Sequence, residues 1–235
     1  MTDNSSTTED HRSRVAAQKR ARMRRRLVES ALVAFARHGI GVTVIPEVIA
    51  SAEVSQGSFY NYFRSNAELL EAVGDTLNLD ILFSIESAIR EIEDPLVRIA
   101  TGIRSYLHLV RSCPVAARFL AGAGLALVDK KSPVFDHFPA DLKAAVKSGR
   151  LIEMNVEVAM ELVGGTGLMA VHRIANGKTP RDYPERITRA VLRSFSVSAE
   201  EAASLTSTTL PKMVIEQGSL LEMAKDAKML QAAEG

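Results

Sequence analysis

The chain has 235 residues, 46% of them hydrophobic, which allows one large domain or a small domain joined to a larger one. Its single cysteine, Cys113, excludes an intrachain disulfide framework and a cysteine-based zinc cluster, which favours a reducing compartment. The formal net charge is only +1, but residues 11–70 alone carry +6. Uncharged apolar runs reach only ten residues, too short to span a bilayer, so we expect a soluble, cytoplasmic protein that does not enter membranes.

The N-terminal region changes character near residue 15. Residues 1–14 are rich in Ser, Thr, Asp and Asn without an apolar period, which predicts a disordered tail. From Val15 to His38 apolar residues recur at helical spacing, and Gly39 then stops the helix. Residues 12–26 carry eight cations, a density that suits phosphate contacts but is equally compatible with a solvated face.

Two short helices and a longer one are predicted next. Thr43 is the expected N-cap of a helix that ends near Ser51, and Pro46 is tolerated because it lies in the first turn. Ser55 is the expected N-cap of the second short helix, and Ser65 opens the longer helix with a capping box completed by Glu68. Two short helices joined by a tight turn indicate a helix-turn-helix, whose second helix enters the DNA major groove.

The rest of the chain is also predicted to be helical, and strand signals are nearly absent. Asp94 is the expected N-cap of a helix with Pro95 at its first position. The predicted helices lie at about 66–92, 95–111, 115–128, 140–148, 152–176, 184–196, 199–208 and 220–232, with a loop at 129–139. We therefore expect an all-α fold, with a three-helix helix-turn-helix domain over 15–70 and a larger helical domain over 71–235.

The second short helix combines aromatic and polar residues in a pattern suited to DNA. Phe59 and Phe63, four apart, can hold the helix on its scaffold. Around them lie groups that can reach base edges or phosphates, and a glycine that permits close approach of the backbone. These residues are Gln56, Gly57, Ser58, Tyr60, Asn61 and Tyr62. A simpler alternative is an amphipathic helix whose tyrosines cover the edge of a core.

Residues 31–70 resemble the TetR family of bacterial transcriptional repressors, above all in Val-Ser-x-Gly-Ser-Phe-Tyr-x-Tyr-Phe-x-Ser-x-x-x-Leu from Val54 to Leu69. The resemblance implies a homodimer that binds a palindromic operator in double-stranded DNA and a small-molecule effector. It implies DNA contacts by Thr43, Gln56, Gly57, Ser58, Tyr60, Asn61 and Tyr62, and we expect Arg24 and Arg25 of the basic arm to join them.

Two positions depart from the family pattern. Glu53 stands in the turn where the family usually has Gly, and Asn66 stands where a Lys commonly touches phosphate. Both changes should weaken DNA affinity, and we hypothesise that the arginine-rich arm compensates.

The resemblance also guides the C-terminal half. Helices 152–176 and 184–196 are expected to form the dimer interface, helped by Gly164, Gly165 and Gly167, although both helices could instead pack within the chain against helix 95–111. A ligand pocket is expected between helices 95–111, 115–128 and 152–176. The candidate lining and polar contact residues are Arg104, Tyr106, His108, Phe119 and Met169.

Catalytic and cofactor motifs are missing from the sequence. The five histidines lack metal-ligand spacing, and neither a glycine-rich phosphate loop nor a nucleophile with a base can be identified. We expect no metal, no cofactor and no enzymatic activity. The sequence favours a ligand-responsive regulator, most simply a repressor released from its operator by a small apolar molecule. An effector-free architectural DNA-binding protein and an all-α enzyme with a basic extension remain the alternatives.

Overall fold

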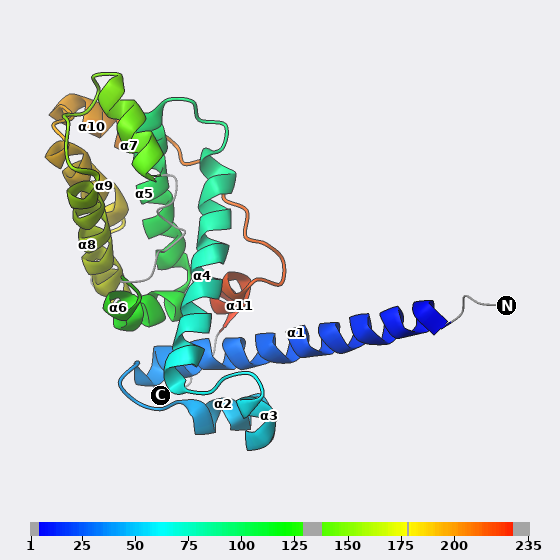
Figure 1. Cartoon of the computed structure of the whole chain (residues 1–235). Coiled ribbons are helices and arrows are strands. Elements are labelled where there is room, and N and C mark those ends of the chain that lie inside the picture. Colours follow the sequence, from blue (N-terminus) through cyan, green and yellow to red (C-terminus); the bar gives the residue numbers. More distant parts are fainter. Residues whose placement is uncertain (1–4, 129–137, 178, 228–235) are drawn as a thin grey trace. The chain divides into compact units, whose positions relative to one another are not determined.

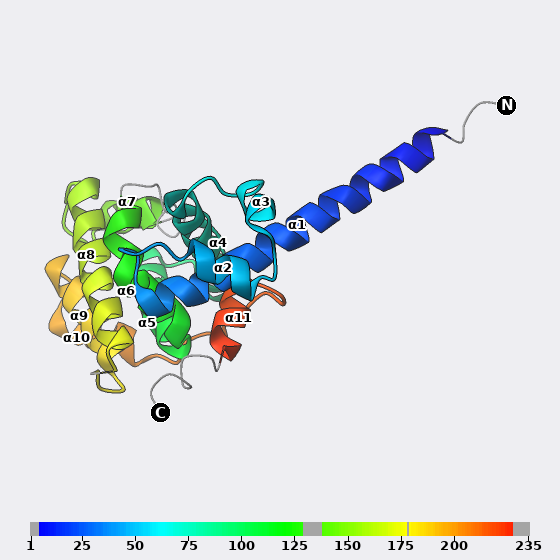
Figure 2. The same ribbon diagram turned by 90° about the horizontal axis from the view of Figure 1, so that it is seen from below.

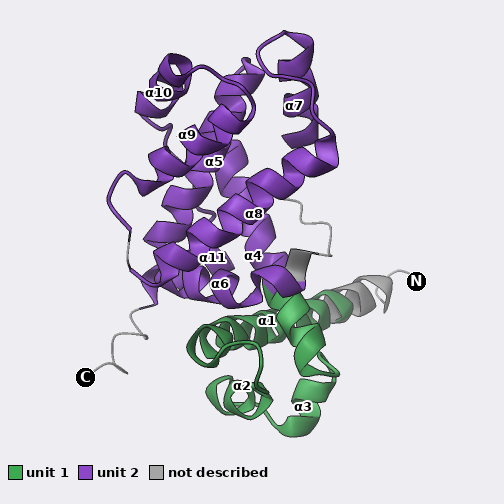
Figure 3. Ribbon diagram, turned by 90° about the vertical axis from the view of Figure 1, so that its left-hand side faces the viewer, with its two compact units in different colours: residues 1–73 green, residues 74–235 purple. Residues whose placement is uncertain are grey.

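The computed structural model describes residues 5–128, 138–177 and 179–227, and all regular secondary structure in these ranges is α-helical, which confirms the predicted fold class (Figure 1). The chain divides into two compact units, Met1–Val73 (unit 1) and Gly74–Gly235 (unit 2), drawn in separate colours in Figure 3. Helix α4, Asn66–Ile89, begins in unit 1 and ends in unit 2.

Unit 1 contains α1 (Ser5–His38), α2 (Ile45–Ser51), α3 (Gln56–Tyr60) and the start of α4. The second half of α1 buries its apolar residues between Leu27 and Phe35, and α2 packs against it. The first half of α1 extends beyond α2 and α3, as the two views in Figures 1 and 2 show. Gly39 follows with a φ of +79°, a left-handed conformation that glycine adopts without steric cost and that ends α1 as expected.

Helix α1 is longer than predicted, because it starts at Ser5 and includes most of the segment expected to be a disordered tail. Residues 1–4 of that tail lie outside the described residues. Once a helix is nucleated, each further residue adds a hydrogen bond at little cost, and residues 5–38 contain neither Pro nor Gly to stop it. The polar residues 5–14 have weak helix propensity, but they continue the helix that starts from the packed C-terminal half of α1.

The start of α2 also differs from the prediction. Thr43 is not its N-cap: the N-cap is Val44, which makes no side-chain capping bond. Instead, the Val44 N–H donates to Oδ1 of Asn66 at 3.0 Å, and Nδ2 of Asn66 donates to the Val42 carbonyl at 3.2 Å. A side chain from the beginning of α4 thus fixes the loop before α2, while Pro46 lies in the first turn as expected.

Unit 2 is built around α5 (Pro95–Ser112), which packs against five neighbouring helices, α6 to α10. Its buried core includes Leu96, Ile99, Leu142, Leu192 and Phe195. The other helices of this unit are α6 (Pro114–Val128), α7 (Phe138–Lys147), α8 (Val156–Ala175), α9 (Tyr183–Ser194), α10 (Ala199–Ser207) and α11 (Leu220–Asp226).

The predicted boundaries in unit 2 hold best where a capping residue sets them. Asp94 caps α5 by accepting hydrogen bonds from the N–H groups of Leu96 and Val97 at 2.8 and 3.0 Å. Helix α8 starts at Val156 rather than near 152 because Asn155 caps it. Helices α4 and α11 end earlier than predicted, and residues 129–137 of the predicted loop and 228–232 of the predicted last helix lie outside the described residues.

The glycines of α8 do not mediate helix packing within the chain. An added Cβ at Gly164, Gly165 or Gly167 would meet no side chain or neighbouring helix within 4 Å. A Cβ on Gly124 of α6, by contrast, would overlap the side chain of Leu168 in α8. The close approach of α6 and α8 therefore depends on a glycine of α6. Helices α8 and α9 both pack against α5, as the intrachain alternative predicted, but not through a close approach at the α8 glycines.

Residues 209–219 connect α10 to α11 and run along α4 within unit 2. The Val214 N–H donates to Oγ of Ser87 at 2.9 Å, and the Leu221 N–H donates to Oδ2 of Asp80 at 3.1 Å. Helix α11 buries Leu220 and Leu221 and packs on α6. The C-terminal segment thus bridges α4 and α6.

Within the described ranges, no helix taken alone combines the length and apolar character of a membrane span. One pair of consecutive helices, Pro95–Ser112 and Pro114–Ala126, reaches that length and composition together but is bent by 113° at the junction.

Candidate functional site

Helix α3 is anchored by aromatic side chains and presents its polar side chains to solvent. Ser55 caps it through a 3.1 Å hydrogen bond from the Ser58 N–H to its Oγ, as predicted. Phe59 is fully buried and Phe63 nearly so, with ring centroids 6.0 Å apart. Tyr60 packs edge-on against Phe59 at 5.4 Å and is still 46% exposed. The helix is therefore fixed by one face while the other is free to contact a partner.

The predicted DNA-contacting residues lie on this free face or beside it. Those exposed are Thr43, Gln56, Gly57, Tyr60 and Asn61, and those half-buried are Ser58 and Tyr62. A Cβ on Gly57 would meet nothing within 4 Å, so the backbone is open to close approach there. Exposed amide and hydroxyl groups on a rigid helix can read base edges and phosphates in a major groove.

The basic side chains of α1 from Arg14 to Arg26 are exposed, and the last arginines approach the helix-turn-helix. The Arg24 guanidinium lies 5.3 Å from the ring centroid of Phe63. Arg25 pairs with Glu29 at 2.7 Å, and Arg26 lies 3.6 Å from a carboxylate oxygen of Glu53. Both pairs are solvent-exposed and contribute little to stability. These arginines can exchange their carboxylate partners for phosphate at small cost.

The two departures from the family pattern have structural roles. Glu53 lies in the turn between α2 and α3 with a φ of +50°, where glycine would be free of strain. Its carboxylate partly neutralises Arg26. Asn66 holds the backbone at Val42 and Val44, so its side chain stabilises unit 1 instead of extending toward phosphate as a lysine would.

Unit 2 contains a cavity, partly open to solvent, between α4, α5, α7, α8 and α9, and its empty space of about 770 Å³ includes the solvent at its open mouth. Most of its walls are aliphatic or aromatic. Among the lining residues that the structure describes, the side chains able to form hydrogen bonds are Glu86, Arg98, Tyr106 and Asp141. Burial raises the pKa of the Tyr106 hydroxyl to about 12, so it is neutral at physiological pH. The cavity suits an apolar body with a few polar groups.

Of the five predicted ligand contacts, only Tyr106 lines this cavity. Phe119 is a core residue with 1% exposure, and Met169 lies on the outer face of α8 with 60% exposure. Arg104 and His108 are engaged elsewhere, in a polar network. The pocket forms between α4 and α5 rather than beside α6, because the α6–α8 contact closes tightly at Gly124.

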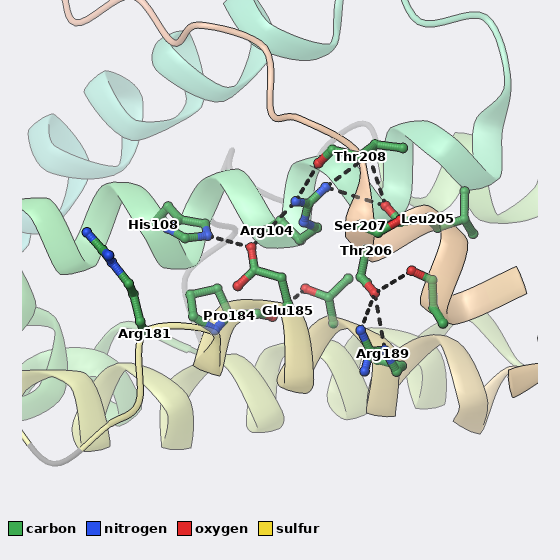
Figure 4. A network of polar contacts seen from close by, with 12 residues as sticks. Arg104, His108, Arg181, Pro184, Glu185, Arg189, Leu205, Thr206, Ser207 and Thr208 are labelled. Atoms are coloured by element: carbon green, nitrogen blue, oxygen red, sulfur yellow. Dashed lines mark hydrogen bonds and ion pairs between the residues drawn. The ribbon is translucent and has the colours of Figure 1, made fainter. Parts of the chain in front are cut away.

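The polar network joins α5 to α9 and to the end of α10 (Figure 4). Arg104 is buried and donates to the carbonyl of Thr208 at 2.8 Å, and Nε2 of His108 lies 2.7 Å from Oε1 of Glu185. Burial acts to raise the pKa of Glu185, but the hydrogen bond with His108 and the charges of His108 and Arg104 outweigh it and lower that pKa. These contacts hold the bundle together, which explains why they do not serve the cavity.

The cavity residues missed from the sequence are Glu86, Arg98 and Asp141. The Arg98 Nε donates to both carboxylate oxygens of Asp141 at 3.0 and 3.1 Å, and its Nη1 donates to the Ile89 carbonyl at 2.8 Å. A periodic signal was present, since Arg98 and Tyr106 are eight residues apart and share one face of α5. Nothing in the sequence pointed to Asp141 as the partner of Arg98.

Two family descriptions match the chain and together cover more than half of it. "Bacterial regulatory proteins, tetR family" matches residues 27–73, and "Tetracyclin repressor-like, C-terminal domain" matches residues 94–208. The first range includes α3 and its capping residues, and the second includes most of the helices around the cavity. None of the curated proteins compared with the chain matches it.

Solved structures show the same fold. The structure of RolR in complex with resorcinol is 26% identical, with a TM-score of 0.60, and the alignment covers 84% of this chain and 100% of that one. A TetR-like regulator from Rhodococcus sp. RHA1 is 19% identical, with a TM-score of 0.57 and coverages of 75% and 97%. FadR from Bacillus subtilis in complex with stearoyl-CoA is 19% identical, with a TM-score of 0.53 and coverages of 74% and 97%.

The exposed recognition helix, the helical bundle and the two family matches agree with one another. A helix-turn-helix whose second helix turns its polar side chains outward is the element with which this class of protein contacts DNA. The chain therefore belongs to the TetR family and is a DNA-binding transcriptional regulator.

Proposed function

We propose that this regulator is a repressor whose α3 binds an operator and whose cavity in unit 2 binds a small, largely apolar molecule that releases the DNA. The observation that carries the proposal is α3 itself, because Phe59 is fully buried while Tyr60 beside it is 46% exposed. Such a helix is held rigidly and still offers its polar groups. Because DNA is its partner, we also propose that the protein acts in the cytoplasm.

The proposed DNA contacts follow from exposure and chemistry. Gln56 and Asn61 carry amides that can pair with the N6 and N7 of adenine, and the Tyr60 hydroxyl can reach a phosphate. Arg24 and Arg25 add electrostatic attraction from the arm. The full set of proposed contacts is Arg24, Arg25, Thr43, Gln56, Gly57, Ser58, Tyr60, Asn61 and Tyr62. Deletion of residues 1–20 should mainly flatten the dependence of affinity on salt, since fewer counterions are released.

The ligand half of the proposal rests on the cavity and on α4. Ile85 and Ile89 of α4 line the cavity, and the same helix begins at the capping box that follows α3. A ligand that binds better to one position of α4 will favour that position, and only such differential affinity can shift the equilibrium. A tenfold loss of operator affinity needs about 1.4 kcal/mol of coupling. RolR with resorcinol and FadR with stearoyl-CoA support a small-molecule effector.

We further propose a homodimer through α8 and α9, in keeping with a two-fold operator. The outer face of α8 exposes Val158, Leu162 and Met169, by 46%, 37% and 60%. Gly165 lies on this face without a neighbour within 4 Å in the chain. Gly165→Leu should weaken the dimer measured by sedimentation, and a monomeric wild type at micromolar concentration would rule this interface out.

Enzymatic activity is not part of the proposal, since regulators of this family are generally not enzymes. The test is a thermal-shift screen of apolar metabolites, followed by titration of each hit with and without the operator mapped by footprinting beside the protein's own gene. Linkage requires that operator weakens ligand binding by the same factor by which ligand weakens operator binding. Hits whose affinity is indifferent to operator would contradict ligand-controlled release and favour an effector-free DNA-binding protein.

A further inference from the structure

One face of α5 supplies a part of the cavity wall in which two polar side chains flank a glycine. Arg98, Gly102 and Tyr106 follow one another at intervals of four residues, and all three line the cavity. Residues four apart lie on the same face of a helix, one turn after another. Along the helix axis, Arg98 and Tyr106 are about 12 Å apart. This face of α5 therefore offers polar groups at two levels of a mostly apolar site.

The Arg98 level is tied to the bundle. Its Nε donates to both carboxylate oxygens of Asp141, at 3.0 and 3.1 Å, and its Nη1 donates to the Ile89 carbonyl at 2.8 Å. These bonds join α5 to α7 and to the end of α4. Much of the guanidinium therefore maintains the packing of the helices, and a substitution of Arg98 would disturb the fold together with any ligand.

The hydroxyl of Tyr106 has no such tie. Among the residues that the structure describes, none forms a hydrogen bond with it. The side chain is half-buried, and yet burial raises the pKa of its hydroxyl to about 12. The surface that Tyr106 keeps therefore belongs to a sheltered site, which is the cavity that it lines. Because a tyrosine hydroxyl in such a site usually has a hydrogen-bond partner, this one is available to a ligand.

Two glycines leave space in the cavity wall for the body of that ligand. An added Cβ on Gly102, one turn before Tyr106, would come no closer than 4.0 Å to a neighbouring atom, Cγ2 of Ile85. An added Cβ on Gly167 of α8 would meet nothing within 4 Å. Both glycines line the cavity, although glycine inside a helix is less favourable than alanine. The walls formed by α5 and α8 are therefore open at these two positions.

We propose that Tyr106 determines the specificity of the cavity, by donating a hydrogen bond from its hydroxyl to an oxygen acceptor of the effector. The effector is then an apolar compound with a carbonyl, ether or hydroxyl oxygen, and its body lies along Gly102 and Gly167. This inference rests on the proposed function, because it concerns the ligand of the same cavity. A hydrocarbon of the same shape would desolvate the hydroxyl without replacing the hydrogen bond, so it would gain nothing from Tyr106.

The test uses two uncharged probes with the same carbon skeleton: butyrophenone, which carries a ketone oxygen, and butylbenzene, which carries none. Calorimetric titration of the full-length protein gives the ratio of their dissociation constants, and comparison of this ratio between variants cancels the difference in hydration of the probes. In Tyr106→Phe the ratio should move by about tenfold in favour of butylbenzene, since only the donor is lost. Tyr183→Phe is the matched control, because Tyr183 begins α9 and does not line the cavity, and the ratio should stay at the wild-type value.

The stability of the ligand-free protein is a second measurement that needs no probe. Because the hydroxyl has no partner among the described residues, Tyr106→Phe should leave Tm unchanged or slightly raised. A hydroxyl that stabilised the bundle through a hydrogen bond would instead lower Tm on removal, by about 2–4 °C for a chain of this size. Such a fall in Tyr106→Phe would overturn the inference.

The outcomes distinguish this inference from the proposed function. No binding of butyrophenone up to its solubility limit, or a ratio in Tyr106→Phe equal to that of the wild type, overturns the role of the hydroxyl. Release of labelled operator is followed in parallel by fluorescence anisotropy. If butyrophenone releases operator from the wild type and from Tyr106→Phe alike, with an unchanged ratio, the inference fails while the proposed repressor function stands. If the ratio moves as expected but saturating butyrophenone leaves operator affinity unchanged, ligand-controlled release fails instead.

Discussion

A larger side chain at a residue that lines the cavity should fill part of its space. Such a substitution should raise the stability of the protein and lower its affinity for ligand. Gly167 of α8 lines the cavity, and a Cβ added to it would meet no neighbouring side chain within 4 Å. Gly167→Leu therefore adds four carbon atoms to the wall of this cavity without a clash at the Cβ. Replacing glycine inside a helix removes a cost of about 0.8 kcal/mol, which corresponds to a rise in Tm of about 2 °C for a chain of this size.

Ligand binding should weaken in the same variant, because the leucine side chain occupies space that the apolar body needs. We expect at least a tenfold loss of affinity, or about 1.4 kcal/mol, in calorimetric titration with an apolar ligand found in the thermal-shift screen. Gly164→Ala is the matched control: it lies on the same helix, its Cβ meets nothing within 4 Å, and it does not line the cavity. A Gly167→Leu protein that folds and retains wild-type affinity would refute the assignment of this cavity as the ligand-binding site. A Tm below that of the wild type would show that the space beside Gly167 is not open.

Three further substitutions test unit 1 and the bundle. Asn66→Ala removes the acceptor of the Val44 N–H and should lower the free energy of unfolding by about 1–2 kcal/mol in urea. Glu53→Gly relieves a left-handed residue and should raise it by about 1 kcal/mol. Asp94→Ala should cost about 1 kcal/mol at neutral pH. Burial acts to raise the pKa of Asp94, but hydrogen bonds from backbone N–H groups and Arg150 lower it overall. Because the folded-state pKa is depressed, that stabilisation is present above the unfolded-state value and should fade between about pH 5 and pH 3.

The features predicted best from the sequence are those determined by neighbouring residues. Ser55 and Asp94 cap their helices as expected, since a capping side chain needs only the backbone two or three residues ahead. The buried Phe59 and Phe63 and the exposed polar face of α3 also follow from local spacing. The DNA-binding half of the candidate site could therefore be proposed residue by residue.

The cavity could not be predicted in this way, because its geometry depends on tertiary packing. Helix α8 carries apolar residues on several of its faces. Their periodicity therefore did not show that Val163 would face the core while Met169 would face solvent. Arg104 was a plausible ligand contact by its position in the sequence. Its guanidinium instead donates hydrogen bonds to the hydroxyl and the carbonyl of Thr208, which lies far along the chain. Ion pairs such as Arg98 with Asp141 likewise join helices whose register is set only by folding.

The departure at Asn66 has a structural role that the sequence did not indicate. The loss of a lysine that commonly touches phosphate suggested weaker DNA binding alone. The amide instead bridges Val42 and Val44 and supplies the contact that the N-terminus of α2 lacks from its own N-cap. The position has therefore exchanged a charge for a structural role.

The central claim, that α3 is the DNA-reading element, is tested most directly by the operator affinity of Tyr60→Ala measured by fluorescence anisotropy. Phe83→Ala is the matched control, since Phe83 is an aromatic residue of similar exposure, 42% against 46%, that lies in unit 2. Tyr60→Ala should weaken specific binding at least tenfold, or about 1.4 kcal/mol, while Phe83→Ala retains wild-type affinity. Unchanged affinity in Tyr60→Ala, or an equal loss in both variants, would contradict the account.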